Sequence, residues 1–426
     1  AAAALATLGA GPRAEAALLA LLQRSASARE RAEVARAFGK VGREVALAAL
    51  DAADPGAARR VRARLARERD PSGVDLDAVL SDLGVPRVRL RVRAGFEEIL
   101  AGEVAARWRG RGPLRVAGVE ACAVVLAPRA PFALRDLYAL RCFDDVGFEL
   151  GHASSPADAD AFAAAVTSPA GRRLLEACTR GTLRYRIEIA GGGHRRALVR
   201  ALAGCCAQRW PELLNDPSRA PWTIEVRPRG ARWVAEAVPH VAPDPRLRYR
   251  VADVPAASHP RLAACMARLA APRAGDDVLD PCCGSGLELV ECALLANVRS
   301  LHGCDRSESA LDAARRNVAA AGLRGVRVRL THGDFRDLRA HGIAPRSFDV
   351  VLTNPPMGRR VRTASVTGVL VDLLAVAAVV LRPGGRLVFP SPIEPPAAPA
   401  GLVLRSRHEV DFGGFPCRLS VYERRG

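Results

Sequence analysis

The loop Thr353-Asn354-Pro355-Pro356 combines residue types that can hold a planar amine in one orientation. Each proline fixes its own φ and restricts the residue before it, so the pair predicts a stiff, extended loop. The side-chain oxygen of Asn354 and an adjacent proline carbonyl would then both accept from one NH2 group. Transfer of a methyl group from a sulfonium to an exocyclic amine needs such positioning and no strong base. The motif therefore predicts amine methylation, with Asn354, Pro355 and Pro356 at the reacting nitrogen.

Arginines follow this loop directly. Arg359 and Arg360 could hold phosphates beside a nucleotide that has left its base stack to reach the loop. In a chain as rich in arginine as this one, they are equally compatible with a solvated basic loop. Both interpretations stay open from the sequence.

A glycine-rich loop lies in the segment DPCCGSGLELVE, residues 280–291. Gly284 and Gly286 allow a sharp turn from strand to helix and a close approach of the backbone to a ligand. A dinucleotide-binding fingerprint would have a third glycine where this chain has Leu289. The loop therefore argues against NAD as the ligand.

Three acidic residues, Asp280, Asp305 and Asp334, stand at the ends of successive predicted strands. An acid after the second strand can accept from both ribose hydroxyls of a nucleoside, which gives Asp305 that role. Asp334 can accept from an adenine amino group, and Phe335 offers a face for stacking. Together these residues predict a site for an adenosyl ligand.

These motifs need a sheet that brings the ends of its strands together. Helices separate the strands expected over 278–281, 300–305, 326–334 and 348–356. Strands alternating with helices of about 10–15 residues are typical of a doubly wound parallel sheet, which binds ligands at the carboxyl ends of its strands. The glycine loop, the acids and the proline loop all follow such ends.

The segments 280–291, 333–337 and 353–360, together with Asp305, resemble the class I S-adenosylmethionine methyltransferases of the D/N-P-P-Y subclass. From about residue 86 the chain resembles the THUMP-domain RNA guanine-N2 methyltransferases, which include tRNA and 23S rRNA enzymes. Looser matches are GFEEILAGEV (95–104), LLNDPSRAPWTIEV (213–226) and DPRLRYRVADVPAASHPRLAACM (244–266).

The resemblance implies an α/β fold: a Rossmann-like class I methyltransferase domain over 250–426, with a mainly parallel sheet and helices on both faces. An α+β ferredoxin-like plus THUMP RNA-binding module over 86–240 would precede it. The implied reaction is methylation of guanine N2 in RNA, with tRNA favoured over rRNA, by S-adenosyl-L-methionine and without a metal. The implied cofactor-binding residues are His259, Asp280, Cys282, Gly284, Gly286, Asp305, Asp334 and Phe335.

The sequence departs from the family pattern at three positions. Met357 stands where the family usually has an aromatic residue that stacks on the flipped base, so substrate binding would fall to a thioether. Base–aromatic stacking contributes ~1–3 kcal/mol elsewhere. Cys282 replaces an aromatic residue and Leu287 a threonine beside the glycine loop. These departures bear on efficiency and target identity more than on cofactor binding.

The net charge of +18 predicts a polyanionic partner, although Lys40 is the only lysine and a bias toward arginine inflates such a number. Residues 86–250 hold 27 Arg against 17 acidic residues, a net of +10, so the excess concentrates there. Arg195 and Arg196 follow a glycine run at 191–193 and could meet phosphate at a helix N-terminus.

Residues 1–80 are predicted to form α-helical HEAT-like repeats with a possible protein partner. The segments 6–22 and 37–53 resemble each other and match Gly9 with Gly39. An alanine-rich helical bundle with accidental similarity is the alternative.

The 11 cysteines include no CxxC pair, and no apolar run reaches the ~18 residues of a membrane span. We therefore expect reduced thiols, no membrane association and a soluble, cytoplasmic protein.

Two alternatives to RNA methylation remain. The same fold could methylate another planar amine, such as a protein glutamine or a DNA adenine. An RNA-binding scaffold with a degenerate cofactor pocket would also fit Met357 and the helical front.

Overall fold

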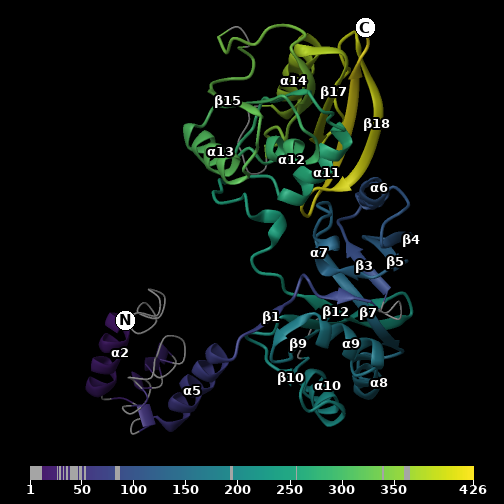
Figure 1. Cartoon of the computed structure of the whole chain (residues 1–426). Helices are drawn as coiled ribbons and strands as arrows, with labels where there is room; N and C mark the ends of the chain where they lie inside the picture. The colour runs from purple at the N-terminus through teal and green to yellow at the C-terminus, as the bar shows by residue number, and fades with distance from the viewer. Residues whose placement is uncertain are drawn as a thin grey trace. The chain divides into compact units, whose positions relative to one another are not determined.

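The computed structural model divides into two compact units, residues 1–73 with 179–184 and residues 74–178 with 185–426 (Figure 1). The structure describes residues 12–25, 27, 30–31, 33–34, 37–38, 47, 50–51, 54–81, 87–191, 195–255, 257–337, 340–358 and 365–426.

The first unit contains helices α2 (Pro12–Arg24) and α5 (Pro55–Arg69). Leu18, Phe38 and Val61 belong to its apolar core. Strand β1 (Ser72–Val74) pairs with β8 (Thr179–Gly181). The HEAT-like repeats and their protein partner stay predictions, because much of the repeated sequence, including Gly9 and Gly39, lies outside the described residues.

The second unit contains an eight-stranded sheet in the order β10-β9-β11-β12-β7-β3-β5-β4. Strand β7 pairs antiparallel with both β3 and β12, so the strands of the region predicted as a ferredoxin-like plus THUMP module form one sheet. The strands are β3 (Arg87–Arg91), β4 (Leu114–Glu120), β5 (Ala123–Pro128), β7 (Asp145–Ala153), β9 (Arg184–Ile189), β10 (Leu214–Asn215), β11 (Trp222–Arg229) and β12 (Arg232–Pro239).

Helices pack on strands in both halves of this sheet. Helix α6 packs on β4 and β5, whereas α8 packs on β7 and β12, and α10 packs on α8. Asp158 and Ser168 cap α8 and α9 by accepting hydrogen bonds from N–H groups of their first turns. Two short strands, β2 and β6, pair with each other. The bounds are α6 (Glu97–Trp108), α7 (Leu134–Leu137), α8 (Ala159–Val166), α9 (Pro169–Ala177), α10 (Arg196–Arg209), β2 (Val79–Leu80) and β6 (Phe132–Ala133).

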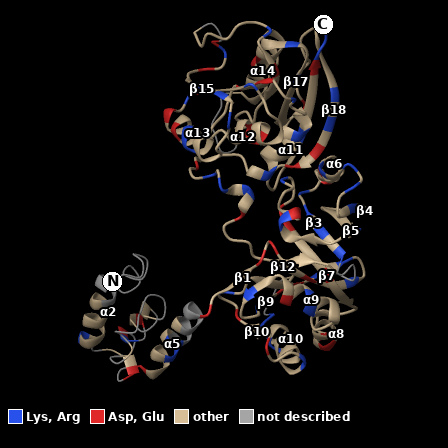
Figure 2. Cartoon of the chain, in the orientation of Figure 1, with Lys and Arg blue, Asp and Glu red and all other residues tan. Residues whose placement is uncertain are grey.

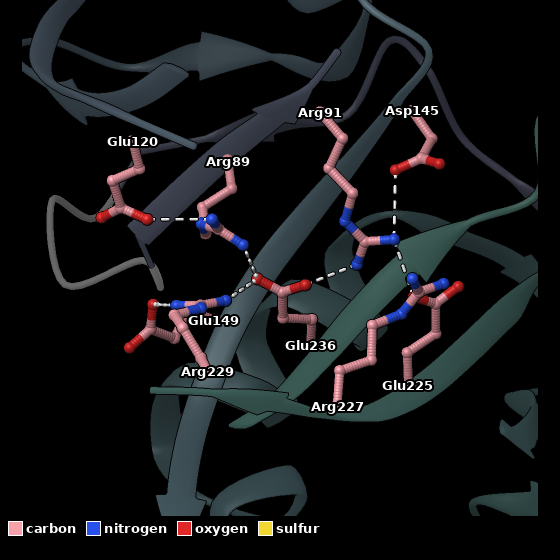
Figure 3. A network of polar contacts seen from close by, with 9 residues as sticks. All are labelled: Arg89, Arg91, Glu120, Asp145, Glu149, Glu225, Arg227, Arg229 and Glu236. Carbon is pink, nitrogen blue, oxygen red and sulfur yellow. Dashed lines mark hydrogen bonds and ion pairs between the residues drawn. The ribbon is translucent and has the colours of Figure 1, made fainter. Parts of the chain in front are cut away.

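A network of arginines and carboxylates joins the strands of this sheet (Figure 3). At its centre Glu236, 2% exposed, accepts from Arg89 at 3.1 Å and from Arg91 and Arg229 at 2.5 Å each. Burial alone would raise the pKa of Glu236, but these three guanidinium groups outweigh it and lower this pKa. Further members of the network are Glu120, Asp145, Glu149, Glu225 and Arg227.

The network changes how the basic charge of the middle region is interpreted. Its four arginines face five carboxylates, so on this face the arginine excess is neutralised (Figures 2 and 3). A polyanion would instead meet arginines outside the network. Arg107, Arg109, Arg111 and Arg115, near the end of α6, are exposed and form no ion pair with the described residues.

The carboxyl-terminal part of the second unit is a seven-stranded sheet in the order β15-β14-β13-β16-β17-β19-β18. Its first five strands are parallel, as predicted, while β17, β19 and β18 pair antiparallel. The sequence prediction does not include β18 and β19. The strands are β13 (Asp277–Asp280), β14 (Ser300–Asp305), β15 (Arg327–His332), β16 (Phe348–Leu352), β17 (Leu381–Ser391), β18 (Leu402–Asp411) and β19 (Pro416–Arg424).

Two apolar clusters join helices to this sheet. Leu370 and Leu373 of α14 pack with Leu279 and Val351 of the central strands. Helices α11 and α12 pack on each other in a separate cluster that includes Leu287. The helices are α11 (Pro260–Ala270), α12 (Leu287–Leu295), α13 (Glu308–Ala320) and α14 (Val366–Val380), with a 3-10 turn, η1, at Pro245–Leu247.

Polar contacts tie the two sheets of this unit to each other. Glu291 of α12 accepts from Arg141 at 2.6 and 2.8 Å and from the Tyr249 hydroxyl at 2.6 Å. Arg246 donates to the carbonyl of Phe143 at 2.7 Å. Glu291 is therefore a structural carboxylate, neutralised by an arginine of the middle region.

Replacing Gly95 by alanine is expected to lower the free energy of unfolding by more than about 2 kcal/mol. Gly95 has φ +87°, and a Cβ there would lie 2.0 Å from the backbone oxygen of Glu409. Gly230→Ala is the matched control. Gly230 also has a positive φ, +57°, but a Cβ there would meet nothing within 4 Å, so only the backbone strain of about 1–2 kcal/mol should be lost from the free energy of unfolding. Urea denaturation followed by circular dichroism checks both. Equal losses in the two variants would contradict the close approach at Gly95.

No helix among the described residues is long and apolar enough to cross a membrane. Within the same part of the chain, no group of three or more His, Cys, Asp or Glu side chains could hold a metal ion. All 11 cysteines are free thiols.

Candidate active site

The candidate site includes Asp280, the last residue of β13, whose side chain is 0% exposed. Its Oδ1 accepts from the Cys282 N–H at 3.1 Å. Burial, the charge of Glu288 and that of Asp305 raise the pKa of Asp280, while the neighbouring Thr353 hydroxyl partly offsets this rise. Neither Asp280 Oδ2 nor the Thr353 hydroxyl has a well-aligned hydrogen-bond partner among the described residues.

The glycine loop after β13 has the predicted turn. Gly284 and Gly286 have φ of +51° and +77°, a region that favours glycine. A Cβ on Gly286 would lie 3.2 Å from the Cβ of Ala314 on α13, whereas one on Gly284 would meet nothing within 4 Å. The loop therefore packs tightly against α13 at Gly286 and leaves space at Gly284.

Asp305 ends β14 and holds this loop in place. Its Oδ2 accepts from the Gly284 N–H at 2.8 Å, and its Oδ1 accepts from the Ser307 N–H at 2.9 Å. Each carboxylate oxygen can accept a second hydrogen bond, so these contacts leave capacity for ribose hydroxyls. The ribose contact of Asp305 stays a prediction.

Asp334 and Phe335 follow β15. Asp334 accepts from the backbone N–H of Arg336 at 3.0 Å and forms an ion pair with its side chain. Burial alone would raise the pKa of Asp334, but the hydrogen bonds and the charge of Arg336 outweigh this effect and lower the pKa. Phe335 is 6% exposed and packs in the apolar cluster of α14. The adenine contacts of both residues stay predictions, and the buried ring limits the face that Phe335 can offer.

Asn354 lies on the proline loop after β16 and is linked to two residues that the sequence prediction does not include, one directly and one through it. Its Nδ2 donates to Ser258 Oγ at 2.8 Å, and Ser258 Oγ in turn donates to Oε1 of Glu288. Glu288 lies in the first turn of α12, where burial raises its pKa and the Ser258 hydroxyl opposes that rise. The sequence contains one indication that Glu288 is unusual, because this acidic residue stands between the apolar residues Leu287 and Leu289.

His259 precedes α11 and is half-buried. Its Nδ1 is buried and has no hydrogen-bond partner among the described residues. Burial, together with the charges of Arg261 and Arg93, lowers the pKa of His259 to about 4. The imidazole is therefore neutral at physiological pH.

The remaining predicted site residues differ in what the structure says of them. Pro355 is buried, and Pro356 and Met357, which follow it on the loop, are half-buried. Burial raises the pKa of Cys282 well above its ordinary value, so this thiol is not a nucleophile. Arg359 and Arg360 lie outside the described residues.

The residues present fit an adenosyl cofactor at this edge of the sheet. His259 Nδ1 is a buried polar atom without a protein partner in the described structure, and neither Asp280 Oδ2 nor the neighbouring Thr353 hydroxyl has a well-aligned one. Such atoms are costly unless a ligand or water completes their hydrogen bonds. Together with the space at Gly284 they form a polar lining that a bound ligand would satisfy.

Comparison with known proteins agrees with this fold. Residues 247–395 match the family model described as RMKL-like, methyltransferase domain. The chain is 35% identical over 173 residues to tRNA (guanine(6)-N2)-methyltransferase of Thermus thermophilus, covering 39% of this chain and 49% of that protein. It is 36% identical over 110 residues to tRNA (guanine(10)-N2)-dimethyltransferase of Methanothermobacter thermautotrophicus, covering 26% of this chain and 30% of that protein.

Among solved structures, TrmN from Thermus thermophilus superposes with a TM-score of 0.64 at 25% identity, covering 79% of this chain and 99% of that chain. The chain spans about half the length, or less, of the curated relatives it matches. The predicted class I fold, the S-adenosylmethionine cofactor and the resemblance to THUMP-type RNA guanine-N2 methyltransferases are confirmed. Residues 247–395 are thus similar to the RMKL-like methyltransferase domains.

Proposed function

We propose that the chain transfers a methyl group from S-adenosylmethionine to guanine N2 in RNA. The observation that carries this proposal is the Asn354 amide, whose Nδ2 donates to Ser258 and which follows Thr353, the neighbour of the buried carboxylate of Asp280. An amide oxygen and a proline carbonyl are the acceptors that an exocyclic NH2 group requires.

In this mechanism, Asn354 Oδ1 and the Pro355 carbonyl accept hydrogen bonds from the two N2 hydrogens. These contacts turn the nitrogen lone pair out of conjugation with the ring and aim it at the methyl carbon. When bound, the cofactor would supply an electrophilic methyl group on a sulfonium. The bond from N2 to the methyl carbon forms as the carbon–sulfur bond breaks, and N2 then loses one of its two hydrogens as a proton to water. His259 is neutral at physiological pH because its pKa is lowered to about 4. A protonated imidazole would oppose binding of the positively charged sulfonium, and the neutral ring does not.

RNA is the substrate that the charge distribution supports. Arg107, Arg109, Arg111 and Arg115 present four exposed guanidinium groups within nine residues, next to the neutralised network of the sheet. The names of both curated relatives specify tRNA guanine N2, which favours tRNA over rRNA here. The free cysteines suit a reducing compartment, and we infer a cytoplasmic location.

The test of substrate identity is mass spectrometry of nucleosides from the tRNA and rRNA pools of cells with and without the gene. The expected result is loss of N2-methylguanosine from the tRNA pool alone. Loss of a methyladenosine with N2-methylguanosine unchanged in both pools would contradict the proposed substrate.

Met357→Tyr is expected to strengthen target binding. A phenol ring at this position can stack on an extruded base, and such stacking contributes ~1–3 kcal/mol, or about fivefold to 150-fold in affinity. The KM for RNA should fall while the KM for S-adenosylmethionine stays constant. Met357→Ala should raise the KM for RNA, since it removes the thioether contact. Steady-state kinetics with both variants measure these KM values. An unchanged KM for RNA in both variants would mean that Met357 does not contact the target base.

A further inference from the structure

Glu288 is a buried carboxylate with an unusual environment. It is 4% exposed, and no arginine or lysine forms an ion pair with it in the described part of the chain. Glu291, one turn further along α12, is equally buried but is neutralised by Arg141. A buried charge without a cation is costly, so hydrogen bonds must stabilise it. The one side-chain donor to Glu288 among the described residues is the Ser258 hydroxyl.

The donor and acceptor inventory fixes the direction of every hydrogen bond in this chain of groups. When Glu288 is ionised, its carboxylate only accepts, so the single proton of Ser258 points at Glu288. The Ser258 oxygen can then only accept from Asn354, and the amide must present Nδ2 to it, at 2.8 Å. Amide orientation is assigned from such a network, and here the network permits one orientation. The Oδ1 atom of Asn354 is left facing away from Ser258.

We propose that Ser258 and Glu288 are positioning residues that hold the Asn354 amide with its oxygen toward the target amine. The inference rests on the proposed function of Asn354 and extends it to two residues that do not touch the substrate. With an inverted amide, Nδ2 would face the NH2 group, and two donors would oppose each other. The Glu288–Ser258 pair thus determines whether the loop accepts from an amine.

Two substitutions are expected to release the orientation of the Asn354 amide, and a third is expected to retain it. Ser258→Ala and Glu288→Leu are expected to lower kcat about tenfold to a hundredfold, since small misplacements at a reacting centre have effects of that size. The KM values for RNA and S-adenosylmethionine should change less than twofold. Glu288→Gln should retain most of the activity, because its Oε1 still accepts from Ser258. Melting temperatures show whether each variant folds.

A second measurement is independent of catalysis. In 15N-labelled full-length protein, the side-chain NH2 resonances of Asn354 are those missing from Asn354→Ala. We expect slow solvent exchange for these protons in the wild type and in Glu288→Gln, and fast exchange in Ser258→Ala.

The outcomes separate the two proposals. If the wild type methylates no guanine but the Asn354 protons are protected, the proposed substrate is wrong and the positioning stands. If Ser258→Ala keeps full kcat and protected Asn354 protons, the positioning is wrong while the reaction stands. A rise in the KM for S-adenosylmethionine with unchanged kcat would also overturn it, since it would assign Ser258 and Glu288 to cofactor binding.

Discussion

Replacing Asn354 by alanine is expected to lower kcat for RNA methylation about a hundredfold to a thousandfold, the range observed when one preorganised hydrogen-bonding group is removed from a reacting centre. The hydrogen bond that the amide oxygen accepts from the amine strengthens as the lone pair turns toward the methyl group, so the loss should lie in kcat. The KM values should change little. Single-turnover kinetics with excess enzyme measure the chemical step directly.

Asn354→Asp is the matched control. It keeps an oxygen that accepts from the amine but removes the Nδ2 donor to Ser258 and brings a second carboxylate near Glu288. We expect activity between those of the wild type and the alanine variant. Full activity in Asn354→Ala, with an unchanged melting temperature, would remove Asn354 from the reaction.

Glu236→Ala is expected to lower the free energy of unfolding of the middle region by about 3–5 kcal/mol, the cost of breaking a buried ion pair from one side. The substitution leaves Arg89, Arg91 and Arg229 without the carboxylate they share (Figure 3). Their mutual repulsion then adds to the loss. No comparable effect on methyl-transfer chemistry is expected, because the network lies in the other sheet of the unit.

Intrinsic fluorescence measures this loss selectively, because all four tryptophans fall between residues 108 and 233, in the middle region. Urea denaturation followed by this signal reports the middle region alone. Glu188→Ala is the control, since Glu188 is half-exposed and pairs with Arg186, and such pairs contribute about 0–1 kcal/mol. A loss below about 1 kcal/mol for Glu236→Ala would mean that the network does not stabilise the sheet.

The parallel strands of the catalytic sheet could be predicted from sequence, because short apolar runs end at glycines, acids or prolines. The strands predicted over 278–281 and 300–305 are found at Asp277–Asp280 and Ser300–Asp305. Strand β7 could not be predicted in this way. It contains Gly147 and Gly151, which weaken strand propensity. A Cβ on Gly147 would lie 3.1 Å from Arg91 and from Glu236, so this glycine makes room for the network.

The candidate site was predictable only where its residues lie within one motif. Asn354 and its prolines form a local pattern, and their interpretation needs no tertiary contact. Ser258 and Glu288 lie 96 and 66 positions before Asn354, and only the folded sheet brings the three side chains together. The charge excess of residues 86–250 was visible in the sequence, but its partial neutralisation by Glu236 depends on strand order.

The most direct test incubates the purified full chain with methyl-labelled S-adenosylmethionine and unmodified tRNA, digests the RNA and separates its nucleosides by liquid chromatography and mass spectrometry. The account predicts label in N2-methylguanosine for the wild type and a loss of at least about a hundredfold for Asn354→Ala. Label in a methylated adenosine, or no label although calorimetry detects S-adenosylmethionine binding, would contradict guanine N2 as the target of the Asn354 loop.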